Sequence, residues 1–148
     1  MNMKDERQFV GYSKYRSRLV DGHVHTELCP HGSGDRTALM IEKAIELRIE
    51  KVCLTEHAPL PAGFAAEYGG DQKAYDTASL KLNQVDTYLE LGRQLQRAYG
   101  THIDISLGFE VDYIPGFETD IQEFLDRYGS LTDDNILSVH FMEGVNNA

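Results

Sequence analysis

Short apolar segments alternate with amphipathic segments along most of the chain, and this alternation constrains the fold more than any other feature. We expect strands at residues 19–25, 51–55, 103–111 and 136–141. Between them, apolar residues recur at spacings of three and four, which predicts helices at residues 35–47, 77–99 and 117–128. This order implies an α/β fold with a parallel sheet and right-handed crossovers. Four strands could form a small open sheet or the first half of a closed barrel, and we favour the half barrel.

The chain of 148 residues has the length of a single domain. Residues 1–18 are polar with scattered aromatic residues, and we expect them to form a loosely held arm before a patterned domain at 19–148. Two prolines and three glycines within residues 58–76 predict a long loop. Long loops inside compact domains are usually functional or mobile.

The charge and cysteine counts narrow the function classes. Lys plus Arg number 14 against 24 Asp plus Glu, for a net charge of −10, which argues against a protein that covers nucleic-acid phosphates with cations. An enzyme that holds phosphate through metal ions remains compatible with this charge. We expect no membrane span, because no apolar run approaches about eighteen residues. Two cysteines are too few for a disulfide scaffold, which predicts a cytoplasmic protein. Cys53 reads as a buried apolar residue, and Cys29 is not spaced with it as in a zinc knuckle.

Each predicted strand ends in potential metal ligands, which lie at or just beyond the carboxyl end where parallel α/β folds place their functional residues. These residues are His23, His25, Glu56, His57, Glu110 and His140. Of the six histidines, only His102 lies at the start of a strand. The coincidence predicts a hydrolytic site with several metal ions.

Each of these residues also has an ordinary interpretation. His23 and His25 are two residues apart and could grip one cation, or they could be a chance pair on a solvated strand. His31 lies on the following loop, where a surface histidine is common. The Glu110 carboxylate could bridge two divalent ions or form a salt bridge, and His140 could be a core histidine.

Several segments resemble motifs of the PHP (polymerase and histidinol phosphatase) superfamily. The first motif is similar to Asp21–Thr26 with Cys29–Gly32, and the second to Thr55–Pro61. Later motifs are similar to Gly108–Tyr113 and Ser138–His140. The Cys-Pro-His-Gly and Glu-His-Ala-Pro forms resemble the histidinol-phosphate phosphatase branch.

This resemblance implies a distorted (βα)7 barrel, of which about the first four βα units are present. It also implies three divalent transition-metal ions per complete site, whether zinc, iron or manganese. By position, the first ion would bind His23 and His25, the second would share Glu110 with the first and add His140, and the third would bind His31 and His57. Further ligands and phosphate-binding arginines that the family carries later have no counterpart here, so we expect a truncated domain.

The reaction that the resemblance implies is hydrolysis of L-histidinol phosphate, a small-molecule phosphate ester, in histidine biosynthesis. Its ammonium and imidazole groups need acceptors, for which Glu67, Asp71 and Asp112 are candidates, unless these are solvated loop charges. Three alternatives remain: a PHP phosphoesterase acting on nucleotides or other phosphoesters, an inactive metal-binding fragment, and a binding module with incidental histidines. An exposed barrel edge would also allow self-association.

Overall fold

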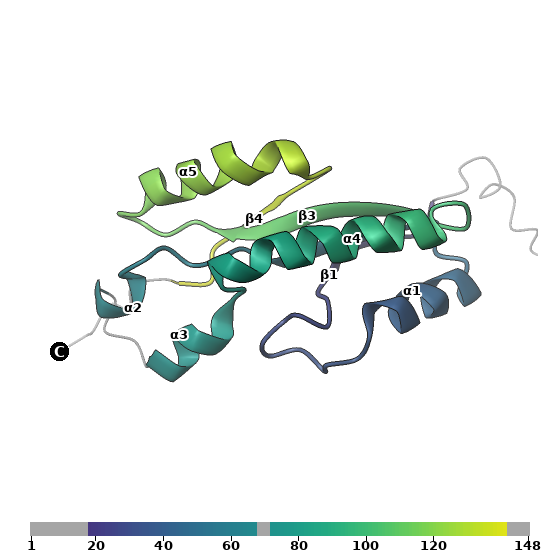
Figure 1. The fold of residues 1–148 in the computed structure, drawn as a ribbon, viewed down its shortest axis with the longest axis horizontal. Coiled ribbons are helices and arrows are strands. Elements are labelled where there is room, and N and C mark those ends of the chain that lie inside the picture. The colour runs from purple at the N-terminus through teal and green to yellow at the C-terminus, as the bar shows by residue number, and fades with distance from the viewer. Residues whose placement is uncertain (1–17, 68–71, 142–148) are drawn as a thin grey trace, which may run out of the picture.

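A single parallel sheet organises the computed structural model, which describes residues 18–67 and 72–141 (Figure 1). The strands lie in the sequential order β1, β2, β3, β4. They are β1 (Val20–Val24), β2 (Lys51–His57), β3 (Asp104–Asp112) and β4 (Ile136–Ser138). The helices are α1 (Thr37–Glu46), α2 (Phe64–Glu67), α3 (Gln72–Ala78), α4 (Val85–Tyr99) and α5 (Glu118–Tyr128), with 3-10 turns η1 (Leu82–Gln84) and η2 (Gly129–Leu131). The predicted α/β class is confirmed.

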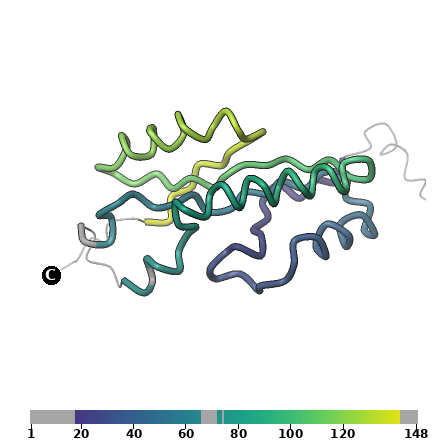
Figure 2. The backbone as a smooth tube through the Cα atoms, in the orientation of Figure 1, coloured from purple at the N-terminus to yellow at the C-terminus, as the bar shows by residue number. Residues whose placement is uncertain are grey.

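The core lies between the sheet and the crossover helices. Figure 2 shows the course of the chain between these two layers. Leu54 on β2 and the alternating residues Leu107 and Phe109 on β3 pack there, because side chains two apart on a strand share a face. Tyr88 and Leu89 of α4 cover them and are almost fully buried. The amphipathic pattern of α4 in the sequence therefore corresponds to one apolar face that packs on the sheet.

The Tyr88 hydroxyl joins the two central strands. It accepts the backbone N–H of Glu56 at 3.3 Å and lies 2.9 Å from the carbonyl oxygen of Leu54 on β2. The carbonyl of Gly108 on β3 is also within hydrogen-bond distance. A buried hydroxyl needs such partners, and here they link β2 to β3.

The segment before β4 is bound to β3 through side-chain hydrogen bonds. The N–H groups of Leu107 and Phe109 donate to the side chains of Asp133 and Asn135, each at 2.9 Å. Between them, the backbone of Asp134 lies so close over Gly108 that a Cβ there would overlap its oxygen. These contacts seat β4, which carries the last candidate ligand, against β3.

Three sequence-based boundaries were wrong. The segment predicted as a loop at 58–76 contains α2 and α3, and Phe64 of α2 packs in a small apolar cluster with Leu60 and Phe117. The long helix predicted at 77–99 begins only at Val85, after a 3-10 turn. The fourth strand ends at Ser138 instead of residue 141, because its partner β3 ends at Asp112. The predicted arm lies outside the described residues, apart from residue 18.

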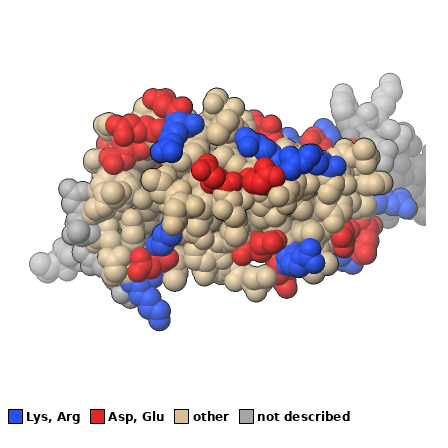
Figure 3. Space-filling view, in the orientation of Figure 1, with Lys and Arg blue, Asp and Glu red and all other residues tan. Residues whose placement is uncertain are grey.

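On the face drawn in Figure 3, acidic and basic side chains are interspersed, and acidic ones gather over α5. No helix among the described residues is both long and apolar enough to cross a lipid bilayer.

The close approach at Gly108 gives a test of how β4 is held. We expect Gly108→Ala to lower the free energy of unfolding by about 1–3 kcal/mol, because Asp134 must move away from β3. Urea unfolding followed by circular dichroism measures this. Gly129→Ala is the matched control, since a Cβ at Gly129 meets nothing within 4 Å and its φ is −60°. Equal stability of the two variants would contradict the described seating of β4.

Candidate metal centre

The register of β2 and β3 places two candidate ligands side by side. His57 and Glu110 are partners across the parallel pair, at the carboxyl end of each strand. Asp112 is two residues after Glu110 and therefore lies on the same face of β3. The residues beyond β4 return to this end, and His140 contacts both Glu110 and Asp112. Parallel pairing brings His57, Glu110 and Asp112 to one end of the sheet, and the segment after β4 adds His140.

A bulge in β1 aims two further histidines at the same point. Val20 and Asp21 pair with Lys51 and Val52, but Val24 pairs with Leu54, so β1 has one additional residue between Asp21 and Val24. Bulges of this kind redirect side chains, and they are frequent next to active sites. His23 and His25 both approach Glu110 as a result, with Nε2 at 3.0 Å and 3.5 Å from its Oε2.

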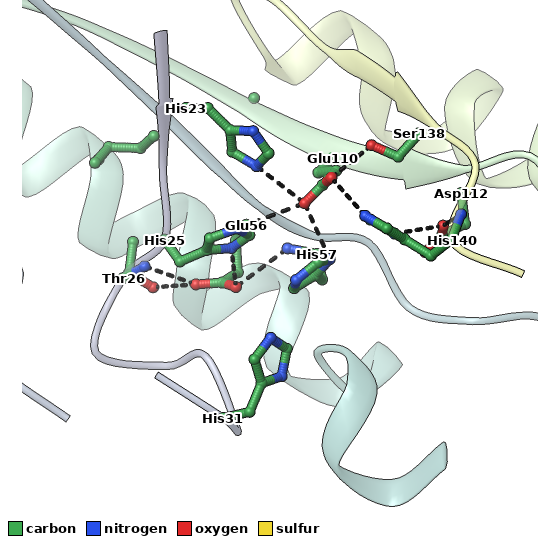
Figure 4. Close-up of polar contacts among 12 residues, drawn as sticks. His23, His25, Thr26, His31, Glu56, His57, Glu110, Asp112, Ser138 and His140 are labelled. Atoms are coloured by element: carbon green, nitrogen blue, oxygen red, sulfur yellow. Dashed lines mark hydrogen bonds and ion pairs between the residues drawn. The ribbon is translucent and has the colours of Figure 1, made fainter. Parts of the chain in front are cut away.

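The Glu110 carboxylate is the centre of the resulting histidine cluster, which we define as His23, His25, His31, His57 and His140 (Figure 4). Its Oε2 lies 3.0 Å from His23 Nε2 and 3.1 Å from His57 Nδ1. Its Oε1 lies 3.3 Å from His140 Nε2 and accepts a hydrogen bond from Ser138 Oγ. The side chain is only 3% exposed. A buried carboxylate therefore has imidazole nitrogens around both of its oxygens.

The surroundings keep Glu110 ionised. Burial by itself raises the pKa of this carboxyl, but the hydrogen bond from Ser138 and the electrostatic interactions with the His57 and His23 rings outweigh it, so the net shift is downward. The pKa of His57 is lowered, first by burial and then by the neighbouring His25. This shift favours the neutral imidazole, the form that binds metal ions.

Three members of the histidine cluster are oriented through Nδ1. His25 Nδ1 lies 3.1 Å from Glu56, His140 Nδ1 lies 2.8 Å from Asp112, and His31 Nδ1 lies 2.8 Å from the carbonyl oxygen of Thr77. A carbonyl only accepts, so His31 donates there. A partner on Nδ1 fixes the ring and leaves Nε2 as the coordinating atom, the usual arrangement around metal-bound histidine.

Glu56 is the most deeply placed carboxylate of the centre. It is fully buried, and it accepts the N–H of Thr26 at 2.8 Å and the Thr26 hydroxyl at 2.7 Å. Burial raises the pKa of the Glu56 carboxyl, but the hydrogen bonds from His25 and Thr26 lower it by more. The net shift is downward, which favours the ionised carboxylate. The hydrogen bond between His25 and Glu56 also raises the pKa of His25 above its ordinary value, although burial of His25 acts in the opposite direction.

The donor set fits divalent cations. Three groups of side chains have ligand atoms within 4.8 Å of one another: His23, His25 and Glu110; His57, Asp112 and His140; and His25, Cys29 and His57. His57 Nδ1 is buried and makes no hydrogen bond among the described residues, although it lies close to Glu110. Such an atom lacks a partner that a cation would supply. An open pocket of about 390 Å³, lined by the histidine cluster, Glu110 and Asp112, gives access.

Comparison with known proteins agrees with this geometry. A family model described as the PHP domain matches residues 21–147. The chain belongs to the PHP domain family. It is 43% identical over 122 residues to the histidinol-phosphatase of Bacillus subtilis (strain 168), a match that covers 82% of this chain and 44% of that protein.

Two solved structures resemble this PHP chain. A Listeria monocytogenes protein, proposed to be a histidinol phosphatase, has a TM-score of 0.81 at 42% identity over 84% of this chain and 46% of its own. A histidinol phosphate phosphatase from Lactococcus lactis, complexed with zinc, L-histidinol and phosphate, has a TM-score of 0.63 at 24% identity over 84% of this chain and 41% of its own, which shows the shared fold. The chain spans somewhat less than half the length of these relatives.

The structure places around one pocket the six residues that the resemblance suggested as metal ligands, His23, His25, His31, His57, Glu110 and His140. Of these, only His31 belongs to none of the three groups found among the described residues. The three residues predicted to contact the substrate lie in different surroundings. The Asp112 carboxylate is buried against His140, with the backbone N–H of His140 also donating to it at 3.3 Å. Glu67 lies in α2, and Asp71 lies outside the described residues.

Sequence reasoning missed the residues that orient the ligands in this PHP domain. The sequence suggests Glu56 as a potential metal ligand, whereas the structure shows it as a buried partner of His25 and Thr26. The sequence points to Thr26 and Ser138 only as members of motifs. Their signal was proximity in sequence, since Thr26 follows His25 directly and Ser138 precedes His140 by two residues. Nothing in the sequence showed which buried carboxylate each would contact.

The His25–Glu56 contact can be tested by titration. We expect Glu56→Gln to lower the pKa of His25 toward its ordinary value of 6.5, because the neutral amide no longer favours the imidazolium. NMR titration of the ring protons in chelator-treated protein measures this, with exposed Glu46→Gln on α1 as the control. Because the pKa of His25 is higher in the folded protein than in the unfolded chain, the contact stabilises the folded state. This stabilisation is fully present below pH 6.5 and is lost as the pH rises through the pKa of the folded state. An unchanged His25 pKa in Glu56→Gln would contradict the contact.

Proposed function

We propose that this chain is the N-terminal part, residues 19–148, of a metal-dependent phosphomonoesterase that hydrolyses L-histidinol phosphate to L-histidinol and phosphate. The observation that carries the proposal is the buried Glu110 carboxylate with imidazole nitrogens at both oxygens. The histidinol-phosphatase relatives support the choice of substrate.

Three divalent cations, of zinc, iron or manganese, would complete the centre. By position, His23, His25 and Glu110 would hold the first, and Glu110 would share the second with His140. His57 would hold the third, together with His31. The chemistry that such cations supply when bound is activation of water near neutral pH and neutralisation of phosphoryl oxygens.

The chain's own residues prepare the site for a phosphate ester. Glu56, Asp112 and the Thr77 carbonyl fix ring orientations, so the open pocket presents Nε2 atoms in fixed positions. Preorganised groups of this kind avoid reorganisation during the reaction. The excess of acidic residues is compatible with an anionic substrate, since bound cations dominate the local field.

The alternative is a PHP phosphoesterase that acts on nucleotides or other phosphoesters. Substrate contacts through Glu67, Asp71 or Asp112 stay predictions, as do a cytoplasmic location and the absence of nucleic-acid and membrane partners. Self-association through the sheet edge also stays a prediction, and it is consistent with the exposure of Leu137 (69%) and Val20 (50%) on the two edge strands.

Metal content tests the centre itself. We expect the purified chain to bind up to three transition-metal ions, as measured by elemental analysis after dialysis. His57→Gln removes a ligand shared by two groups and should lower the bound metal. His102→Gln is the matched control, because His102 lies beside the start of β3, at the opposite end of the sheet. A metal content that responds equally to both variants would contradict the proposed ligands.

A chimera tests the reaction. The matching residues of this chain replace the corresponding 44% of the Bacillus subtilis relative, and phosphate release is measured with L-histidinol phosphate and with a nucleoside monophosphate. We expect preference for L-histidinol phosphate, and we expect Glu110→Gln to lower kcat by about 10²–10³-fold. A folded, metal-loaded chimera that prefers the nucleotide would favour the alternative function.

A further inference from the structure

The pocket beside the candidate metal centre has an apolar part as well as its polar ligands. Among the described residues that line it, Phe141 and Ala78 are apolar, and the others are the histidine cluster, Glu110 and Asp112. The Phe141 side chain is partly buried, so one part of its ring packs on the protein and another part is accessible from the pocket. A molecule bound in this pocket would therefore meet both kinds of surface.

Buried aromatic side chains fix the position of the Phe141 ring. It packs edge-to-face on Phe64 with ring centroids 4.7 Å apart, and Phe64 packs edge-to-face on Phe117 at 6.0 Å. Phe64 and Phe117 are only 4% and 7% exposed. Aromatic rings favour this geometry, and here the buried rings hold the accessible ring of Phe141 in place.

The backbone that leads to Phe141 is fixed as well. The N–H of His140 donates to Asp112 at 3.3 Å, and Nδ1 of the His140 ring lies 2.8 Å from the same carboxylate oxygen. Two residues earlier, the carbonyl of Ser138 accepts the N–H of Tyr113 at 2.7 Å. A candidate metal ligand and the apolar surface thus come from consecutive residues of one anchored segment.

The two parts of the pocket suit the two ends of one molecule. Cations at the metal ligands would take a phosphate group, whose charge the Phe141 ring cannot balance. A phenylalanine ring offers no strong hydrogen bond, and its preferred partner is another aromatic ring, in an offset-stacked or edge-to-face arrangement. The arrangement therefore favours a phosphate ester whose alcohol part carries an aromatic ring.

We propose that Phe141 is a specificity-determining residue, which contacts the aromatic ring of the alcohol part of the substrate while the phosphate group lies at the metal ligands. The inference rests on the proposed function and names the imidazole of L-histidinol phosphate as the group that Phe141 recognises. A phosphate ester without a ring would meet the same metal ligands and lose only the contact with Phe141.

Two substrates that differ in the ring test this role in the chimera described above, made to include Phe141. O-Phosphoethanolamine carries the phosphate and ammonium groups of L-histidinol phosphate and lacks its imidazole. We expect Phe141→Leu to lower kcat/KM for L-histidinol phosphate about three- to tenfold and to leave kcat/KM for O-phosphoethanolamine unchanged. Phe141→Tyr keeps the ring and should keep the preference of the wild type.

The matched control is Phe124→Leu. Phe124 is also a partly buried phenylalanine in an aromatic cluster, with ring centroids 5.1 Å from Phe109 and 5.0 Å from Tyr128. It lies on α5 and does not line the pocket of the metal centre. We expect this variant to leave the ratio of the two kcat/KM values unchanged.

NMR of the wild-type chimera gives a second readout, which depends neither on a variant nor on activity. L-Histidinol or ethanolamine, each with inorganic phosphate, is added to the Zn²⁺-loaded protein, and the signals of isotope-labelled phenylalanine rings are followed. We expect L-histidinol to shift the Phe141 signals through the ring current of its imidazole and to leave those of Phe124 in place. Ethanolamine should shift neither.

The outcomes separate the role of Phe141 from the proposed function. The role is overturned, and the function stays intact, in three cases: the preference for L-histidinol phosphate survives Phe141→Leu, the variant loses activity equally on both substrates, or L-histidinol leaves the Phe141 signals of an active chimera unshifted. A folded, metal-loaded wild-type chimera that hydrolyses neither substrate, or that prefers O-phosphoethanolamine, would overturn both.

Discussion

One buried carboxylate organises this protein's candidate site. Burying an ionised group is costly unless donors or cations compensate it, and Glu110 has imidazole nitrogens from β1, β2 and the segment after β4 around it, together with the Ser138 hydroxyl. These groups come from segments far apart in sequence, and the fold of the sheet brings all of them into contact with Glu110. Three features are needed for these contacts: the register of β2 and β3, the bulge in β1 and the pairing of β4 with β3.

Much of this convergence follows from the sequence. Alternating strands and helices imply a parallel sheet, and parallel strands bring their carboxyl ends to one edge. His57 and Glu110 lie toward the carboxyl ends of their strands and His140 lies just beyond one, so parallel pairing places all three at the same edge of the sheet. The bulge in β1 was beyond sequence reasoning, because a pattern of period two does not show an additional residue. The bulge lies at Gly22 and His23, and it allows both His23 and His25 to reach one carboxylate.

The errors have a common physical origin in tertiary contacts. Prolines and glycines predicted a loop at 58–76, yet Phe64 finds a buried cluster with Leu60 and Phe117, and that packing stabilises short helices whose own propensity is weak. The partners on Nδ1 were hidden for a similar reason. Asp112 read as a free acceptor for substrate, whereas the fold places its carboxylate 2.8 Å from His140 Nδ1. Sequence shows which groups are titratable, but only the fold shows which of them are already paired.

The distribution of ligands bears on what kind of metal centre this is. Each group found among the described residues supplies three protein ligands. The groups lie beside an open pocket, so a cation bound there would be within reach of water or a small molecule. Carboxylate and carbonyl partners on Nδ1 add to this view, since they fix ligands in place before a cation arrives. The buried network of Thr26, Glu56 and His25 is then a support for chemistry, and its cost in desolvation is offset by the hydrogen bonds that Glu56 accepts.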